Sequence, residues 1–87
     1  MWFVYILECR NKTYYAGITN NIERRIKEHN ARKGGYYTSA FGPVRLIWKE
    51  KHEDKIYALK RESQIKSWTR VKKEALMKGD FKLLKKL

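Results

Sequence analysis

The chain has 87 residues, 43% of them hydrophobic, and a chain of this length buries only about 60% of its unfolded surface, so we expect one small domain, residues 1–87. A single cysteine excludes an intrachain disulfide, and one cysteine with two histidines argues against a zinc site. No apolar run approaches the ~20 residues of a membrane span, and none resembles a signal peptide. We therefore expect a cytoplasmic protein with no membrane partner. Its 21 lysines and arginines against 9 acidic residues give a formal charge of +12, which favours nucleic acid as the partner over a merely solubilising surface.

The first predicted elements are two strands joined by a turn. Residues 2–9, WFVYILEC, are rich in aromatic and branched side chains and are apolar on both faces until Glu8. Residues 14–18, YYAGI, are the expected return strand. Together these segments predict a β-hairpin.

The turn decides whether Tyr5 and Tyr15 point the same way. If residues 10–12 form a three-residue loop, Tyr5, Tyr15 and Gly17 share one face of the hairpin; a two-residue turn points the two phenols to opposite faces. A tyrosine on a strand ordinarily has only a structural role, with its ring half-buried and its hydroxyl in contact with water. Both arrangements stay open.

A helix and a loop follow. Asn20 or Asn21 can cap a helix expected over residues 22–31, because an asparagine oxygen accepts a backbone N–H of the first turn. Residues 32–43 contain two pairs of turn-forming residues, Gly34-Gly35 and Gly42-Pro43, and predict an exposed loop.

The second half of the chain predicts one strand and three helices. Residues 44–52 are the strand, with Val44, Leu46 and Trp48 on one face. The expected helices run from a cap at Asp54 to about Trp68, from a cap at Thr69 to Gly79, and over a short last turn after Asp80. The element order predicts an α/β (α+β) fold with a small three-stranded, mostly antiparallel sheet flanked by helices.

Glu62 stands among apolar neighbours at helical spacing. Ala58, Leu59 and Ile65 lie three or four residues away and share its side of the helix. A carboxylate in such a place is costly unless a cation or hydrogen bonds meet it. It either faces a cleft to hold a metal ion or sits on a rim, paired with a lysine.

Arg25 and His29 lie four residues apart on one helical face. An arginine can clamp a phosphate with paired hydrogen bonds, and a histidine can donate, accept or relay a proton. Taken alone, Arg25 also suits a solvated helix face, and His29 a helix C-terminus favoured by the dipole. Gly17 indicates close approach of another group, because a glycine within a strand often does.

Taken together, these residues resemble the GIY-YIG nuclease superfamily. The pattern is residues 3–5, FVY, then residues 15–17, YAG, then Arg25, His29 and Glu62. Three letters of the two motifs differ, at positions 3, 4 and 16, while both tyrosines and the glycine are kept. The likeness covers about residues 3–76 and is greatest to the small stand-alone bacterial branch related to the catalytic domain of structure-selective repair endonucleases.

The resemblance implies a metal-dependent endonuclease that hydrolyses DNA phosphodiester bonds, on branched or repair intermediates. Glu62 would hold Mg²⁺, for which Mn²⁺ could substitute, and Arg25 would neutralise the scissile phosphate. Tyr5 or Tyr15 would be the base, with Tyr5 slightly favoured. His29 would orient that phenol, whose reference pKa near ~10 must be lowered by cations such as Arg25 and the metal.

The remaining predictions concern binding. Contacts to the nucleic-acid backbone and bases are expected from Arg24, Lys33, Tyr36, Tyr37, Thr38 and Arg70. DNA is preferred over RNA, and a monomer over an oligomer. A protein partner could assist targeting, since one domain alone should bind modestly and with strong salt dependence. The alternative function is a basic DNA- or RNA-binding module that does not cut.

Overall fold

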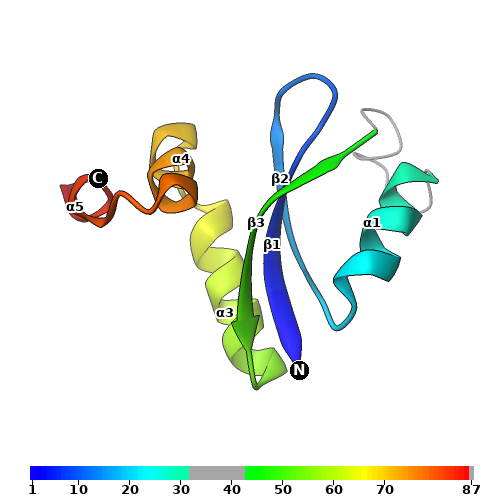
Figure 1. Ribbon diagram of the computed structural model, residues 1–87. Coiled ribbons are helices and arrows are strands. Elements are labelled where there is room, and N and C mark those ends of the chain that lie inside the picture. Colours follow the sequence, from blue (N-terminus) through cyan, green and yellow to red (C-terminus); the bar gives the residue numbers. More distant parts are fainter. Residues whose placement is uncertain (32–42, 87) are drawn as a thin grey trace.

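The computed structural model describes residues 1–31 and 43–86, which contain a three-stranded antiparallel sheet of order β2-β1-β3. Its elements are β1 (Trp2–Glu8), β2 (Tyr14–Thr19), α1 (Ile22–Asn30), β3 (Arg45–His52), α3 (Lys55–Lys66), α4 (Arg70–Lys78) and α5 (Phe81–Lys86). Helix α1 covers one face of the sheet, and α3 and α4 lie on the other (Figure 1). The predicted α+β class is confirmed. Within the described ranges, no helix is long and apolar enough to cross a membrane.

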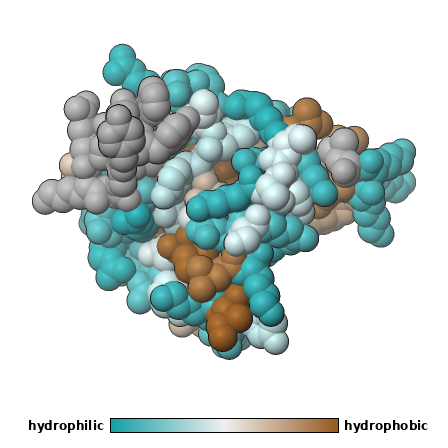
Figure 2. Space-filling view, turned by 180° about the vertical axis from the view of Figure 1, so that it is seen from behind, coloured by the Kyte–Doolittle hydropathy of each residue, from teal (hydrophilic) through white to brown (hydrophobic). Residues whose placement is uncertain are grey.

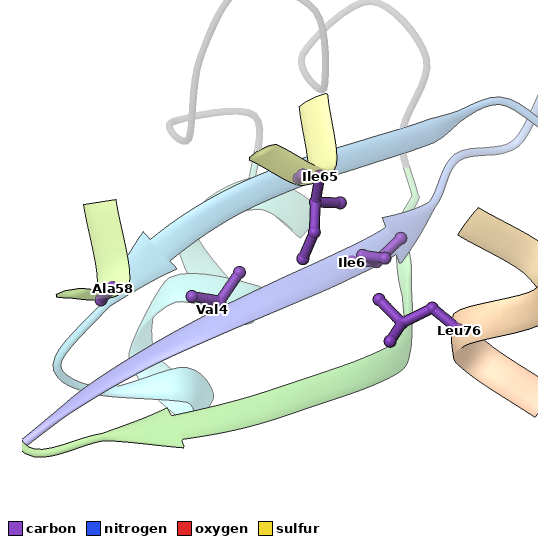
Figure 3. Close-up of a cluster of buried hydrophobic side chains, with 6 residues drawn as sticks. Val4, Ile6, Ala58, Ile65 and Leu76 are labelled. Carbon is purple, nitrogen blue, oxygen red and sulfur yellow. The ribbon is translucent and has the colours of Figure 1, made fainter. Parts of the chain in front are cut away.

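The main core lies between the sheet and helices α3 and α4. Alternation along β1 points Val4 and Ile6 towards these helices, where they meet Ala58, Ile65 and Leu76 (Figure 3). All five are at most 4% exposed. Burial of each larger aliphatic side chain is worth about 1.5–3 kcal/mol, so this layer supplies much of the driving force for folding.

A second cluster lies on the opposite face, beneath α1. Tyr5, Leu7, Cys9 and Val44 form its buried part. Side chains from α1 and neighbouring strands pack against it: Tyr15, Ile22, Ile26 and Leu46. The alternation of β1 therefore sends its tyrosine to the α1 side while its valine and isoleucine fill the main core.

The hairpin has the three-residue loop that places both tyrosines on one face. The N–H of Cys9 donates to the carbonyl of Thr13 at 2.8 Å, which closes the turn. In the resulting register Tyr5 pairs with Gly17, and Tyr15, two residues earlier on β2, points the same way. Of the two turns left open by the sequence, this is the one the chain adopts.

The prediction for the third strand was wrong in one respect. Val44 and Leu46 do face the α1 side, but Trp48 packs into the main core instead. The cause is a register shift: β1 pairs Ile6 with Trp48 and its next residue with Leu46, so Ile47 is an extra residue. Such a β-bulge reverses the alternation beyond it.

The helix ends follow the predicted caps. The side chains of Asn21, Asp54 and Thr69 accept backbone N–H groups of α1, α3 and α4. Gly79 ends α4 in the left-handed conformation, with φ of 71°. Helix α3 ends at Lys66, two residues before the expected end. The face seen in Figure 2 is mostly hydrophilic, with hydrophobic residues in small patches, as expected for a charge of +12.

Candidate active site

The hydroxyl of Tyr5 is the centre of a buried polar cluster beneath α1. It lies 3.2 Å from Nε2 of His29 and accepts a 3.4 Å hydrogen bond from Nε of Arg25. Tyr5 is 2% exposed and His29 is fully buried. Because Arg25 and His29 are four residues apart, one face of α1 brings both to the same phenol.

Tyr15 completes an aromatic group around His29. Its ring centroid lies 5.3 Å from that of the imidazole, and the Tyr5 ring lies at 6.2 Å, both edge-on. Tyr15 is only partly buried, whereas Tyr5 is enclosed. The two phenols predicted to share a face therefore flank one imidazole, in the edge-to-face geometry that aromatic rings favour.

Gly17 lies directly beneath the Tyr5 ring. A Cβ at this position would come within 2.5 Å of the phenolic oxygen and 2.7 Å of Cζ. No side chain fits there without moving the ring. The close approach predicted from a glycine within a strand is thus to Tyr5 itself.

The protonation states of the cluster are governed by burial first. Burial raises the pKa of Tyr5; the hydrogen bond and the positive charge of Arg25 lower it, but the net direction is upward. Burial and then the charge of Arg25 lower the pKa of His29 to about 4. At neutral pH the imidazole is uncharged and Tyr5 keeps its proton, so Arg25 alone does not produce the lowered tyrosine pKa that the proposed chemistry needs.

Glu62 lies on α3, on the other side of the sheet from this cluster. Its side chain is 16% exposed, and Nζ of the more exposed Lys66 lies 3.8 Å away. An i,i+4 pair of this kind contributes only about 0.3–0.5 kcal/mol. The negative charge of Glu62 is the last of the contributions that raise the pKa of Tyr5, after burial and Tyr15.

The donor set around Glu62 limits the kind of metal it could hold. Residues 1–31 and 43–86 contain no group of three His, Cys, Asp or Glu side chains able to ligate one ion. Among these residues Glu62 would thus have at most one protein partner of this kind, with water and substrate oxygens as the remaining ligands. That set suits a hard, well-hydrated cation such as Mg²⁺ and does not suit Zn²⁺.

A groove of about 530 Å³ opens beside Arg25, at the β2 edge of the sheet. Arg24, predicted to contact nucleic acid, lines it, and its guanidinium is held by Asn20 at 2.9 Å and by Glu28 at 3.6 Å. The sequence reasoning missed the five other lining residues: Trp2, Ile18, Thr19, Asn20 and Glu28. The sequence suggests Asn20 only as a helix cap, although the polar Thr-Asn-Asn run before a basic helix is a usable signal for a binding groove.

The other predicted binding residues are not part of this groove. Arg70, on α4, donates to the carbonyl of Lys12 at 2.6 Å, lies over the ring of Tyr14 at 4.1 Å and pairs with Glu74. These contacts tie α4 to the hairpin turn, and a role in nucleic-acid binding stays a prediction. Lys33, Tyr36, Tyr37 and Thr38 lie outside the described residues.

Comparison with known proteins places this geometry in a family. The model of the GIY-YIG catalytic domain matches residues 1–75. A UPF0213 protein of Natronomonas pharaonis is 45% identical over 75 residues, which cover 86% of this chain and 88% of the relative. A UPF0213 protein of Bacillus cereus is 48% identical over 77 residues, or 87% and 80% of the two chains.

Solved structures agree with the sequence comparison. The solution NMR structure of a UPF0213 protein from Bacillus halodurans matches with a TM-score of 0.59 and 40% identity, covering 90% of this chain and 84% of the other. A solution NMR structure of an E. faecalis protein gives a TM-score of 0.62 at 37% identity, with 91% and 84% covered. The chain therefore belongs to the GIY-YIG family, and this membership implies nuclease activity.

Proposed function

We propose that the chain is a Mg²⁺-dependent endonuclease that hydrolyses DNA phosphodiester bonds. The observation that supports this most is the Arg25 guanidinium, hydrogen-bonded to the Tyr5 hydroxyl at 3.4 Å while it lines the open groove. A guanidinium oriented by a buried phenol is already positioned for the charge that develops on a phosphate.

Arg25 is proposed to neutralise the scissile phosphate, and Tyr5 and His29 to hold Arg25 in place. Because Nε of Arg25 donates to the Tyr5 oxygen, the phenolic proton is best directed to Nε2 of His29. The lowered pKa of His29 keeps that nitrogen available as an acceptor. These two hydrogen bonds thus hold the Arg25 guanidinium at its Nε.

Tyr15 is the better candidate for the base. Tyr5 is 2% exposed, its pKa is raised, and its hydroxyl already has two partners. A base must touch the attacking water, and Tyr15 is the phenol with part of its surface open. We therefore assign proton acceptance to Tyr15 and the alignment of Arg25 to Tyr5, which reverses the slight preference drawn from the sequence.

Glu62 is proposed as the protein ligand of Mg²⁺. GIY-YIG nucleases generally depend on a divalent metal. When bound, the ion would supply stabilisation of negative charge on the phosphate and the leaving 3′ oxygen. The alternative for Glu62 is an ordinary ion pair with Lys66, and the two can be separated by substitution.

The test is cleavage of branched, nicked and single-stranded DNA, with matching RNA substrates, in Mg²⁺ or in chelator. Arg25→Ala and Glu62→Gln should each lower the single-turnover rate at least ~10²-fold. The first removes the positive charge that neutralises the scissile phosphate, and the second removes the carboxylate proposed to hold the metal ion. Lys66→Ala is the matched control: it breaks the ion pair but keeps the carboxylate, so its rate should stay near wild type. Binding without cutting of any substrate would instead favour the non-catalytic DNA- or RNA-binding module.

A further inference from the structure

A second groove, of about 490 Å³, lies between the end of β3 and the outer side of α3. Its lining is basic and aromatic rather than acidic: His52, Tyr57, Lys60, Arg61 and Gln64. Two of these lining residues engage the carboxylate of Glu50: His52 at 2.8 Å and Arg61 at 3.1 Å. The groove therefore presents positive charge to a ligand.

Tyr57 and Lys60 are the two lining residues with the fewest polar contacts to the rest of the described protein. Tyr57 is 64% exposed, and Nζ of Lys60 lies 5.8 Å from the centroid of its ring. Across residues 1–31 and 43–86 neither side chain makes a hydrogen bond or ion pair. Arg61, in contrast, is fixed by Glu50 and by Gln64 at 2.7 Å.

This groove lies at the same end of the sheet as the groove beside Arg25. Trp2 lines the Arg25 groove, and on the sheet it pairs with His52, which lines the second one. Nζ of Lys55, at the start of α3, lies 4.8 Å over the Trp2 ring, so a cation and an aromatic ring also occupy the end of the sheet. A polyanion bound at Arg25 thus has a basic, aromatic surface around that end.

We propose that the Tyr57 groove binds the single-stranded nucleic acid flanking the scissile phosphate, with a base stacked on Tyr57 and a phosphate on Lys60. An exposed ring beside a cation is the arrangement that binds single strands, because every base offers a face for stacking and every phosphate a charge. The proposal rests on the proposed function, since it takes nucleic acid to be the partner. It adds a second contact surface on the opposite side of the sheet from Tyr5.

The test is fluorescence anisotropy of a labelled single-stranded DNA with the full chain, in chelator, so that binding is measured without cleavage. Tyr57→Ala should weaken binding about tenfold, whereas Tyr57→Phe, which keeps the ring, should bind as wild type. Lys60→Ala should reduce the salt slope by about 0.7, the value for one phosphate contact on a single strand. Lys82→Ala, on exposed α5, is the control for loss of one positive charge elsewhere.

Equal weakening by Tyr57→Ala and Tyr57→Phe, or by Lys60→Ala and Lys82→Ala, would overturn the proposal. So would the absence of any single-strand binding.

The outcome is separable from that of the proposed function. Tyr57-dependent binding by a chain that never cuts would support this surface and refute the nuclease, and cutting with Tyr57-independent binding would do the reverse. Tyr57 is 64% exposed, so thermal melts of its variants should match wild type.

Discussion

Gly17 and Tyr5 face each other across the β1–β2 pair, and the phenol occupies the space where any other residue at position 17 would place its Cβ. This single relationship holds the Tyr5 hydroxyl in reach of both Arg25 and His29. The glycine is thus a part of the site although it carries no functional group.

The first prediction is that Gly17→Ala damages both stability and cleavage. Its Cβ would lie 2.5 Å from the Tyr5 oxygen, and the enclosed ring, 2% exposed, has little room to move. Overpacking of this kind costs about 1–3 kcal/mol, and the displaced phenol would release Arg25. Urea unfolding and single-turnover cleavage measure the two effects separately.

Gly79→Ala provides the comparison for that variant. Gly79 has φ of 71° at the end of α4, and a Cβ there meets nothing within 4 Å. Alanine in this conformation should cost about 1 kcal/mol through backbone strain alone. Cleavage should be unchanged once the protein is folded. If both alanine variants lost cleavage in proportion to stability, Gly17 would have no special place in the site.

The contrast between Gly17 and Ile47 shows what the sequence could and could not predict about the fold. A glycine between strand residues signals close approach whatever the partner, and the partner proved to be Tyr5. The bulge at Ile47 had no such marker: Leu46, Ile47 and Trp48 are all apolar, so alternation could not reveal the extra residue. Only pairing with β1 decides it.

In the site, too, one part could be predicted from the sequence and another could not. The pattern of Tyr5, Arg25 and His29 predicted the group that the structure brings together. The direction of the Tyr5 pKa could not be predicted, because it depends on how completely α1 covers the phenol, and burial outweighs the guanidinium. Enclosure is a property of packing between distant segments, which no local pattern carries.

The second prediction concerns the turn of the hairpin. Lys12 has φ of 69°, a conformation that costs a residue with a Cβ about 1 kcal/mol. Lys12→Gly should therefore raise the free energy of unfolding by some tenths to about 1 kcal/mol, less the entropy that glycine gains in the unfolded chain. The bond from Arg70 goes to the backbone carbonyl and is kept. Denaturant unfolding checks this, and a lower midpoint would contradict it.

The third prediction separates the metal from folding. One carboxylate, 16% exposed, cannot form a structural metal site, and no cluster of three ligands lies in the part of the chain that the structure describes. Chelator should abolish cleavage but leave the thermal midpoint unchanged. Scanning calorimetry with and without chelator decides this. A large fall in the midpoint would mean that the ion binds elsewhere and supports the fold.

The fourth prediction follows from the buried imidazole of His29. Its pKa is lowered from 6.5 to about 4 in the folded chain, so the unfolded chain takes up a proton first as the pH falls. The contribution of His29 is then fully present above about pH 6.5 and is lost as the pH falls towards 4, with a total of roughly 3 kcal/mol. Urea unfolding at pH 7.5, 6.5, 5.5 and 5.0 should show stability falling with acid.

His29→Gln should be less stable than wild type at pH 7.5, because it loses the fitted contact with Tyr5, yet its stability should fall less between pH 6.5 and 5.0. This comparison removes the titration of carboxylates, which both proteins share and which takes place mostly below that window. The difference in stability between the two proteins should therefore shrink as the pH falls. A constant difference would mean that the imidazole has the same pKa in the folded and the unfolded chain. In that case the enclosure of His29 by Tyr5, Tyr15 and α1 would not keep the imidazole neutral.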